Sequence, residues 1–274
     1  LFTNQTKCNN KTMIKLGLLA DVQYCDCEDG MDYSKTRKRY YRNSLEILDH
    51  SLKFFESEEC FNILQLGDLI DGKCKELGIT NEALNAIGKR FEEDKFELFH
   101  VIGNHELYNL SRRKYCDSFM GNSLKKYRNC ETELNYYKVD LTPKVCLIIL
   151  DTYEISVLGE RTSVEGENNY LTAKKIILEH NKNENWNNSD GLQMPRFVAY
   201  NGAVGQTQLK WLEEQLNECT IKDKIVIVAG HIPLLINESD KSTMLWNSEE
   251  LIDILHRYTC VKTYLSGHNH VKNI

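Results

Sequence analysis

The chain contains six short apolar runs, and five of them lead directly into residues that can bind a metal ion. Short β-rich runs bounded by Gly or acidic residues are typical of buried strands, and open α/β sheets carry their sites at the carboxyl ends of such strands. We therefore predict strands at 15–20, 61–66, 97–102, 145–150, 224–229 and 261–265. Glycine precedes the candidate ligand in four of the five segments, which favours sharp turns and close approach of the backbone.

Length and charge limit the class of protein. A chain of 274 residues that is 41% hydrophobic can bury a core as one domain. No stretch reaches the eighteen or more apolar residues of a membrane span, and a net charge of −6 argues against a general nucleic-acid binder. We predict one α/β domain over 1–274 that acts as a monomer, contacts neither membrane nor nucleic acid, and carries a cap-like insertion at about 156–205.

The remaining periodicity predicts helices and one hairpin. Amphipathic spacing indicates helices at 34–58, 206–217 and 248–258. The insertion contains one plausible short helix, at 172–180, and the segment 136–150 has the pattern of two strands joined by a tight turn.

The ten cysteines show no disulfide framework or zinc-binding CxxC pair, so we expect buried, reduced thiols such as Cys60 and Cys146 and a cytoplasmic location. Five Asn-x-Ser/Thr sequons leave a secreted form open.

The metal-binding segments supply oxygen and nitrogen donors together. Two carboxylates, two amides and three imidazoles make up the set: Asp21, Asp68, Gln23, Asn104, His231, His268 and His270. This mixture suits Mn²⁺, Mg²⁺ or Fe²⁺ better than a thiolate-rich zinc site does. Two ions about 3.5–4 Å apart can hold a hydroxide and clamp phosphoryl oxygens. We therefore predict a two-metal site that hydrolyses phosphate esters, with Asp68 as the bridging ligand.

His105 differs from the other candidate histidines because it lies between Asn104 and Glu106. Its side chain is expected to face the substrate, where it binds a phosphoryl oxygen or protonates the leaving group. Asp71 is expected to orient His105 or to anchor its own loop. The four other histidines are interpreted as ordinary surface or core residues: His50, His100, His180 and His256.

At this point the motifs resemble a known family. The order D-x-Q, GDxxD, GNHE, GH and GHxH is similar to that of the calcineurin-like metallophosphoesterase superfamily, which implies a double β-sandwich flanked by helices (αββα). The first motif of that superfamily is usually D-x-H, and here Gln23 takes the place of the histidine. With the stretches 28–30, 36–45, 64–68, 200–202, 208–212 and 246–247, the chain resembles the manganese-dependent ADP-ribose/CDP-alcohol diphosphatase family over nearly its whole length.

The resemblance implies hydrolysis of the diphosphate bond in ADP-ribose or CDP-alcohols such as CDP-choline, with Mn²⁺ preferred. By position, one ion takes Asp21, Gln23, Asp68 and His270. The other takes Asp68, Asn104, His231 and His268.

Substrate contacts are also implied by matched positions. Arg39, on the first predicted helix, is the candidate for the second phosphate, with Arg37 and Lys38 as alternatives on the same segment. Tyr33 either stacks on a nucleobase or packs as an ordinary tyrosine. The family continues past the last motif, so the resemblance implies that further residues follow Ile274.

Two other functions remain open from sequence. One is a different phosphodiesterase of the same superfamily, acting on cyclic nucleotides or phospholipid head groups. The other is a scaffold without metal, which would predict eroded ligand positions, whereas all seven positions here hold coordinating side chains.

Overall fold

The computed structural model describes residues 13–32, 35–91, 95–127, 133–235 and 241–270. Within them the strands are β1 (Leu16–Leu19), β2 (Gly30–Met31), β3 (Lys38–Arg39), β4 (Asn62–Gln65), β5 (Glu97–His100), β6 (Tyr137–Thr142), β7 (Val145–Ile149), β8 (Ile225–Ala229) and β9 (Val261–Leu265). The helices are α1 (Asn43–Ser57), α2 (Lys73–Leu77), α3 (Thr80–Gly88), α4 (Asn104–Asn109), α5 (Arg112–Asp117), α6 (Phe119–Ser123), α7 (Val164–His180), α8 (Gln206–Ile221) and α9 (Ser248–His256), with a 3₁₀ turn at Lys241–Thr243.

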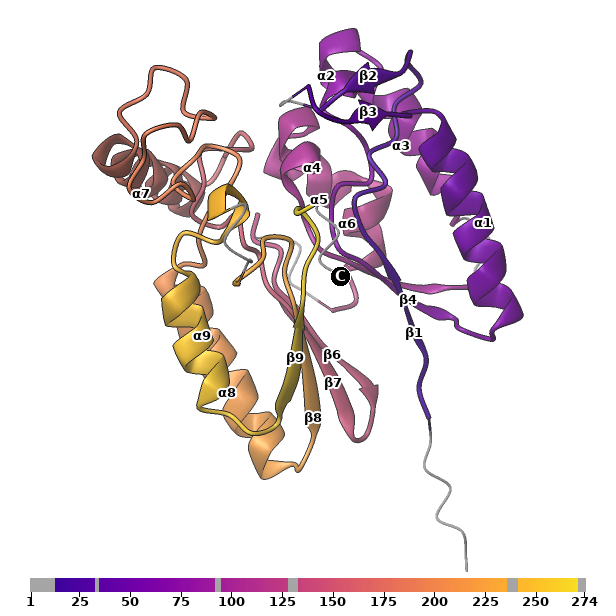
Figure 1. Cartoon of the computed structure of the whole chain (residues 1–274). Coiled ribbons are helices and arrows are strands. Elements are labelled where there is room, and N and C mark those ends of the chain that lie inside the picture. The colour runs from indigo at the N-terminus through magenta and orange to yellow at the C-terminus, as the bar shows by residue number, and fades with distance from the viewer. Residues whose placement is uncertain (1–12, 33–34, 92–94, 128–132, 236–240, 271–274) are drawn as a thin grey trace, which may run out of the picture.

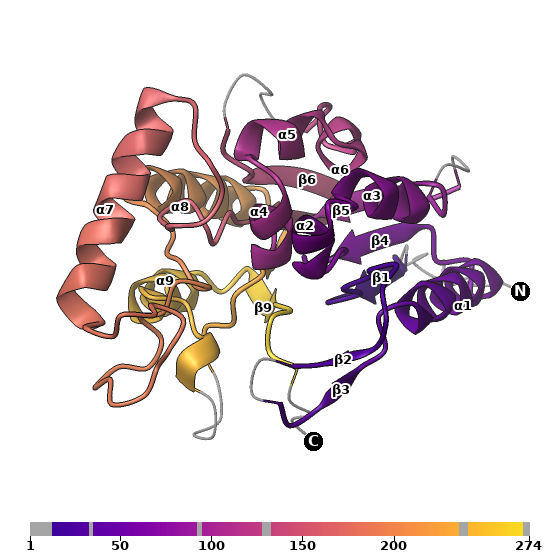
Figure 2. The same ribbon diagram turned by 90° about the horizontal axis from the view of Figure 1, so that it is seen from above.

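Two main sheets form the centre of the molecule. One has the order β1-β4-β5 with all strands parallel, and the other has the order β6-β7-β8-β9, in which only the β6–β7 pair is antiparallel. Figures 1 and 2 show α1 outside the first sheet, and α8 and α9 outside the second. The predicted αββα architecture is thus confirmed.

The side chains of the strands alternate between two cores, as the period of two requires. Leu64, Phe99 and Leu147 belong to the cluster between the sheets. Ile63 and Val228, their neighbours on the opposite face, belong to the cluster that includes the buried residues of α1, α8 and α9. Burial on both faces explains why these strands read as continuous apolar runs.

All six predicted strands are present, with ends that agree to within two residues, and the hairpin is the antiparallel pair β6–β7. The predicted helices 206–217 and 248–258 correspond to α8 and α9. The helix expected at 172–180 is longer, because α7 begins at Val164, where Ser163 accepts a hydrogen bond from Gly166 N as an N-cap.

The helix predicted at 34–58 is wrong in its first turns. Helix α1 begins only at Asn43, and the preceding residues form the small antiparallel hairpin β2–β3. Asp32 closes this hairpin, since its carboxylate accepts hydrogen bonds from the backbone N–H groups of Thr36 and Arg37. The basic run that looked like a helix face is therefore an arm that projects from the sheet.

No helix among the described residues is long and apolar enough to cross a lipid bilayer. The eight cysteines in the described ranges are all buried and form no disulfide with one another, Cys60 and Cys146 among them. The compartment and the oligomeric state stay predictions.

Candidate active site

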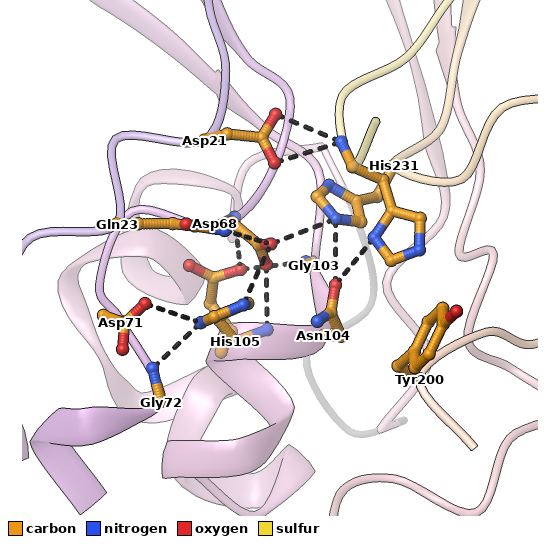
Figure 3. A network of polar contacts seen from close by, with 12 residues as sticks. Asp21, Gln23, Asp68, Asp71, Gly72, Gly103, Asn104, His105, Tyr200 and His231 are labelled. Carbon is orange, nitrogen blue, oxygen red and sulfur yellow. Dashed lines mark hydrogen bonds and ion pairs between the residues drawn. The ribbon is translucent and has the colours of Figure 1, made fainter. Parts of the chain in front are cut away.

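The predicted ligands lie at the ends of five strands that meet along one seam between the two sheets. Asp21 and Gln23 follow β1, Asp68 follows β4 and Asn104 begins α4 just after β5. The histidines come from the other sheet, with His231 after β8 and the pair His268 and His270 after β9. Figure 3 shows several of these side chains converging from separate segments.

Asp68 and Asn104 occupy the centre of the group. The Oδ2 atom of Asp68, which is 1% exposed, lies 3.3 Å from His231 Nε2 and 3.3 Å from Gln23 Nε2. The Oδ1 atom of Asn104 lies 3.1 Å from His231 Nε2 and 3.0 Å from His268 Nδ1. These four contacts join residues from both sheets.

Asp21 and His270 extend the group toward solvent. His270 Nε2 lies 3.1 Å from Asp21 Oδ1 and 3.2 Å from Gln23 Nε2. Both carboxylate oxygens of Asp21 accept hydrogen bonds from the backbone N–H of His268. Through these contacts the structure brings all seven predicted ligands into one connected set.

The charges in the site depend on one another. Burial favours the neutral form of Asp68, but His231 and His105 outweigh it and hold the pKa of the Asp68 carboxyl well below its usual range. Burial also opposes the charged form of His231, yet Asp68 raises the pKa of this imidazole to about 9. Burial and the neighbouring His231 lower the pKa of His268 well below its usual value. Asp68 and His231 therefore form a buried ion pair, in which a metal ion would replace the proton of His231.

The donor set fits a divalent ion. Ligand atoms of Asp68, His231 and His268 lie within 4.8 Å of one another, and all three side chains are buried. Buried side chains of this kind carry a large desolvation cost unless a partner charge compensates it. Hard oxygen donors mixed with imidazole nitrogens suit Mn²⁺.

The backbone at the site is strained. Asp21, Gln23, Asp68 and His268 all have positive φ, at 51°, 46°, 61° and 68°. Non-glycine residues in this region cost about 1–3 kcal/mol each and cluster at functional sites. These left-handed backbone conformations occur at four of the seven predicted ligands.

Two of the glycines that precede the predicted ligands permit this close packing. Gly67 has a φ of 100°, and a Cβ there would overlap the ring of His231. At Gly103 a Cβ would overlap the carboxylate of Asp68. Only glycine fits at either position.

His105 lies on α4 and faces the cleft. Its Nδ1 atom accepts a hydrogen bond of 2.9 Å from Gly72 N–H and lies 3.4 Å from the Asp71 carboxylate. Its Nε2 atom is 3.8 Å from Asp68 Oδ2. Because Nδ1 accepts a hydrogen bond, the proton of the neutral imidazole is on Nε2, the nitrogen that points toward the ligand group.

Arg39 lies on β3 and not on a helix, yet it reaches the site. Its guanidinium donates to Gln23 Oε1 and to Asp71 Oδ2, at 3.3 Å for the latter, and lies 3.4 Å from His270 Nδ1. The amide oxygen of Gln23 thus faces Arg39, while its nitrogen faces Asp68 and His270. Tyr33 lies outside the described residues.

Sequence reasoning missed two buried residues that hold the ligand loops. Glu106, in the GNHE motif, accepts hydrogen bonds from the backbone N–H groups of Asp68, Leu69 and Gly103. Tyr153 donates to Asn104 Oδ1 at 3.2 Å. The motif position was a usable signal for Glu106, whereas Tyr153 is 49 residues from its partner and carries no local signal.

A cleft of about 1070 Å³ opens over the ligands. Its lining includes site residues such as Asp68 and His105, a basic wall and a polar rim. The wall contains Arg37, Arg39, Lys73 and Lys75, and the rim is formed by Asn187, Asn188, Ser189 and Asp190 of the cap-like segment. A cleft of this size can hold a phosphorylated small molecule, whose phosphates these four cationic side chains can bind, although Asp32, Asp71 and Glu76 also line the cleft.

The fold and site define a family. The sequence model of the calcineurin-like phosphoesterase family matches residues 14–272. Since this match spans nearly the whole chain, the protein belongs to the calcineurin-like phosphoesterase family.

Particular relatives are also similar over nearly the whole chain. A manganese-dependent ADP-ribose/CDP-alcohol diphosphatase from Mus musculus is 33% identical, with 95% of this chain and 78% of the mouse protein covered. The protein of the same name from Arabidopsis thaliana is 35% identical, with 94% and 80% covered. Among solved structures, a dimetal phosphatase from Danio rerio matches with a TM-score of 0.87 at 31% identity, covering 94% of this chain and 82% of that one.

Proposed function

We propose that this protein is a manganese-dependent diphosphatase that splits the diphosphate bond of ADP-ribose and CDP-alcohols. Water adds across the P–O–P linkage, and the products are a nucleoside monophosphate and a second phosphomonoester. The observation that carries the proposal is the complete set of seven donors, in a chain that matches relatives named for this activity along almost all of its length.

Two divalent ions are proposed for the site, Mn²⁺ by preference and Mg²⁺ or Fe²⁺ as alternatives. One would be held by Asp21, Gln23, Asp68 and His270, and the other by Asp68, Asn104, His231 and His268. The ions would lower the pKa of a bound water and polarise the phosphoryl group. A half-turn of the Gln23 amide would present its oxygen in place of its nitrogen.

His105 is proposed as the proton donor. In the imidazolium form, Nε2–H faces the ligand group and Nδ1–H faces the Asp71 carboxylate, 3.4 Å away, so loss of the Nε2 proton leaves a neutral ring. In the neutral form that keeps its proton on Nε2, Nδ1 accepts from Gly72 N–H. From this position the imidazole can bind a phosphoryl oxygen or protonate the departing phosphate.

Arg39 is proposed to bind the phosphate that does not undergo attack. It lies at the junction of the ligand group and the basic wall, and its side chain is 22% exposed to the cleft. A guanidinium so placed can bind two phosphate oxygens in parallel. Its contact with the Asp71 carboxylate, at 3.3 Å, fixes its approach to the site, since the contact with Gln23 is lost when that amide turns. Because all seven donors come from one chain, catalysis by a monomer requires no second copy.

The test is a substrate panel with defined metal. ADP-ribose and CDP-choline, incubated with the purified protein and Mn²⁺ in ¹⁸O-labelled water, should yield AMP and CMP, with one ¹⁸O atom in one product of each pair. A chelator should abolish release. Turnover of cyclic nucleotides or phosphomonoesters, without release of AMP or CMP from any diphosphate, would contradict the proposal and favour another phosphodiesterase of the family.

A further inference from the structure

A buried amide of the cap-like segment reaches the predicted metal ligands. Asn201 is 0% exposed, and its Oδ1 atom lies 2.8 Å from Nε2 of His268. The two residues are 67 positions apart in the sequence. This is a direct polar contact between the segment 156–205 and the ligand group.

The orientation of the Asn201 amide is fixed by two other contacts. Its Nδ2 atom donates to the backbone carbonyls of Arg196, at 2.8 Å, and Ser242, at 2.6 Å. A carbonyl can only accept, so both contacts require the nitrogen of the amide and leave its oxygen facing His268. Because that oxygen also can only accept, the hydrogen of this contact is on His268 Nε2.

This assignment decides which nitrogen of His268 is free to bind a metal ion. With the proton on Nε2, the neutral imidazole has its lone pair on Nδ1. Nδ1 is the atom 3.0 Å from Asn104 Oδ1, and Asn104 Oδ1 already accepts from the Tyr153 hydroxyl. Two acceptors at this distance repel each other unless a cation lies beside them. The contact therefore marks a position that a cation would stabilise.

His231 is fixed in the opposite sense. Its Nδ1 atom lies 2.7 Å from the backbone carbonyl of Leu66, which can only accept, so this nitrogen carries a proton. Nε2 of His231 then faces Asp68 and Asn104. The two histidines thus offer different ring nitrogens to the same space, and each is oriented by a partner behind the ring.

We propose that Asn201 is a positioning residue that holds His268 in the tautomer with its lone pair on Nδ1, so that the cap-like segment forms part of the metal site. The inference rests on the metal site of the proposed function and not on the identity of the substrate. It differs from a purely structural role, in which Asn201 would only join the cap to the 3₁₀ turn at Lys241–Thr243.

Asn181 provides a matched control. It is also a buried amide of the cap, at 1% exposure. Its Nδ2 atom donates to the backbone carbonyls of Trp186, Asn188 and Phe197, and its Oδ1 atom accepts from Asn183 N–H, so none of these contacts involves a histidine. Asn181→Ala should therefore disturb the cap as much as Asn201→Ala does, without changing His268.

The experiment is ¹⁵N NMR of the imidazole nitrogens in chelator-treated protein labelled with ¹⁵N-histidine, with the His268 signals identified by their loss in His268→Asn. Wild type and Asn181→Ala should show a protonated Nε2 and an unprotonated Nδ1. Asn201→Ala should lose this single tautomer.

Binding of Mn²⁺ by calorimetry is the second measurement. Asn201→Ala should weaken one of the two sites by about 10–100-fold, the usual cost of losing such a partner, and Asn181→Ala should not. A protonated Nδ1 in the wild type would overturn the inference, even if Asn201→Ala did not fold. An unchanged tautomer and affinity in Asn201→Ala would also overturn it. Failure of the wild type to hydrolyse diphosphates would count against the proposed function alone.

Discussion

The two sheets contribute different chemistry to the site. The strands β1, β4 and β5 deliver the oxygen donors, and the strands β8 and β9 deliver the imidazole nitrogens. The donors in question are Asp21, Gln23, Asp68 and Asn104 from the first sheet and His231, His268 and His270 from the second. Neither sheet holds the complete set of predicted ligands. The site therefore depends on how the sheets are placed relative to each other as well as on the ligands themselves.

The sheets are joined directly near the site. The hydroxyl of Tyr137, on β6, donates to the backbone carbonyl of His100 on β5 and accepts from its N–H, both at 3.0 Å. Leu64, Phe99 and Leu147 pack in the core between the sheets. Changes to the donors and changes to this junction should thus have separable effects, the first on activity and the second on stability.

The largest effect is expected from Asp68→Asn, which removes the charge of the first sheet's central donor. Asp68 contacts both Gln23 and His231, so its loss should cost several kcal/mol of transition-state stabilisation. That corresponds to about three orders of magnitude or more in kcat. Asp49→Asn, on α1 and paired with Arg90, is the control. A near-normal kcat in Asp68→Asn would show that Asp68 is not the central donor of the site.

His105→Asn should lower kcat by about 10²–10⁴-fold, the usual contribution of a general acid. Because His105 is not among the seven donors, the variant should still bind two Mn²⁺ ions, as measured by metal analysis. Loss of metal together with activity would mean that His105 belongs to the ligand set.

The pH dependence of stability should reveal the buried histidine of the first sheet, His100. Burial lowers the pKa of His100 to about 3, below its ordinary value of 6.5. The folded state therefore keeps His100 neutral, while the unfolded chain takes up a proton below pH 6.5. The contribution of His100 to stability is complete above pH 6.5 and is lost progressively as the pH falls toward 3.

At pH 5 this loss should reach about 2 kcal/mol. In urea unfolding of metal-free protein, His100→Asn should lose less stability between pH 7.5 and pH 5 than the wild type by about this amount. His256→Asn, at the exposed end of α9, serves as control. Identical pH profiles for wild type and His100→Asn would refute the assignment.

The smallest effect is expected from Tyr137→Phe, which cuts the junction and leaves every donor in place. Two backbone groups of His100 lose their partner, at a cost of about 1–2 kcal/mol in the free energy of unfolding. Tyr127→Phe is the matched control, because the Tyr127 hydroxyl contacts Glu97 of the first sheet. If the placement of the two sheets governs the site, Tyr137→Phe should also weaken Mn²⁺ binding, and Tyr127→Phe should not. Equal Mn²⁺ affinities in the two variants would argue against a role for sheet placement.

The strands and their ligands could be predicted from sequence because their signals are local. A strand buried on both faces is a continuous apolar run, and the Gly-Asp, Gly-Asn and Gly-His pairs follow it directly. The start of α1 was not predictable in this way. The apolar spacing begins only at Tyr41 and does not mark where the helix starts. Before it, Asp32 closes a hairpin, and Arg37 donates to the backbone carbonyl of His270, 233 positions away.

Short helices and distant partners were missed for related reasons. Helices α2, α4, α5 and α6 have five or six residues, too few to show a period of 3.6. Glu106 and Asn201 act through contacts with residues that are distant in sequence or held by tertiary structure. Glu106 pairs with the loop after β4, and Asn201 brings the cap-like segment against the loop after β9. Both pairings depend on tertiary structure that the local sequence does not specify.

The most direct test of a two-metal site at this seam is titration of chelator-treated protein with Mn²⁺, followed by electron paramagnetic resonance. The account predicts two ions per chain and a spectrum with exchange coupling between them, since ions held by one bridging carboxylate lie about 3.5–4 Å apart. A single ion per chain, or two ions without coupling, would contradict it.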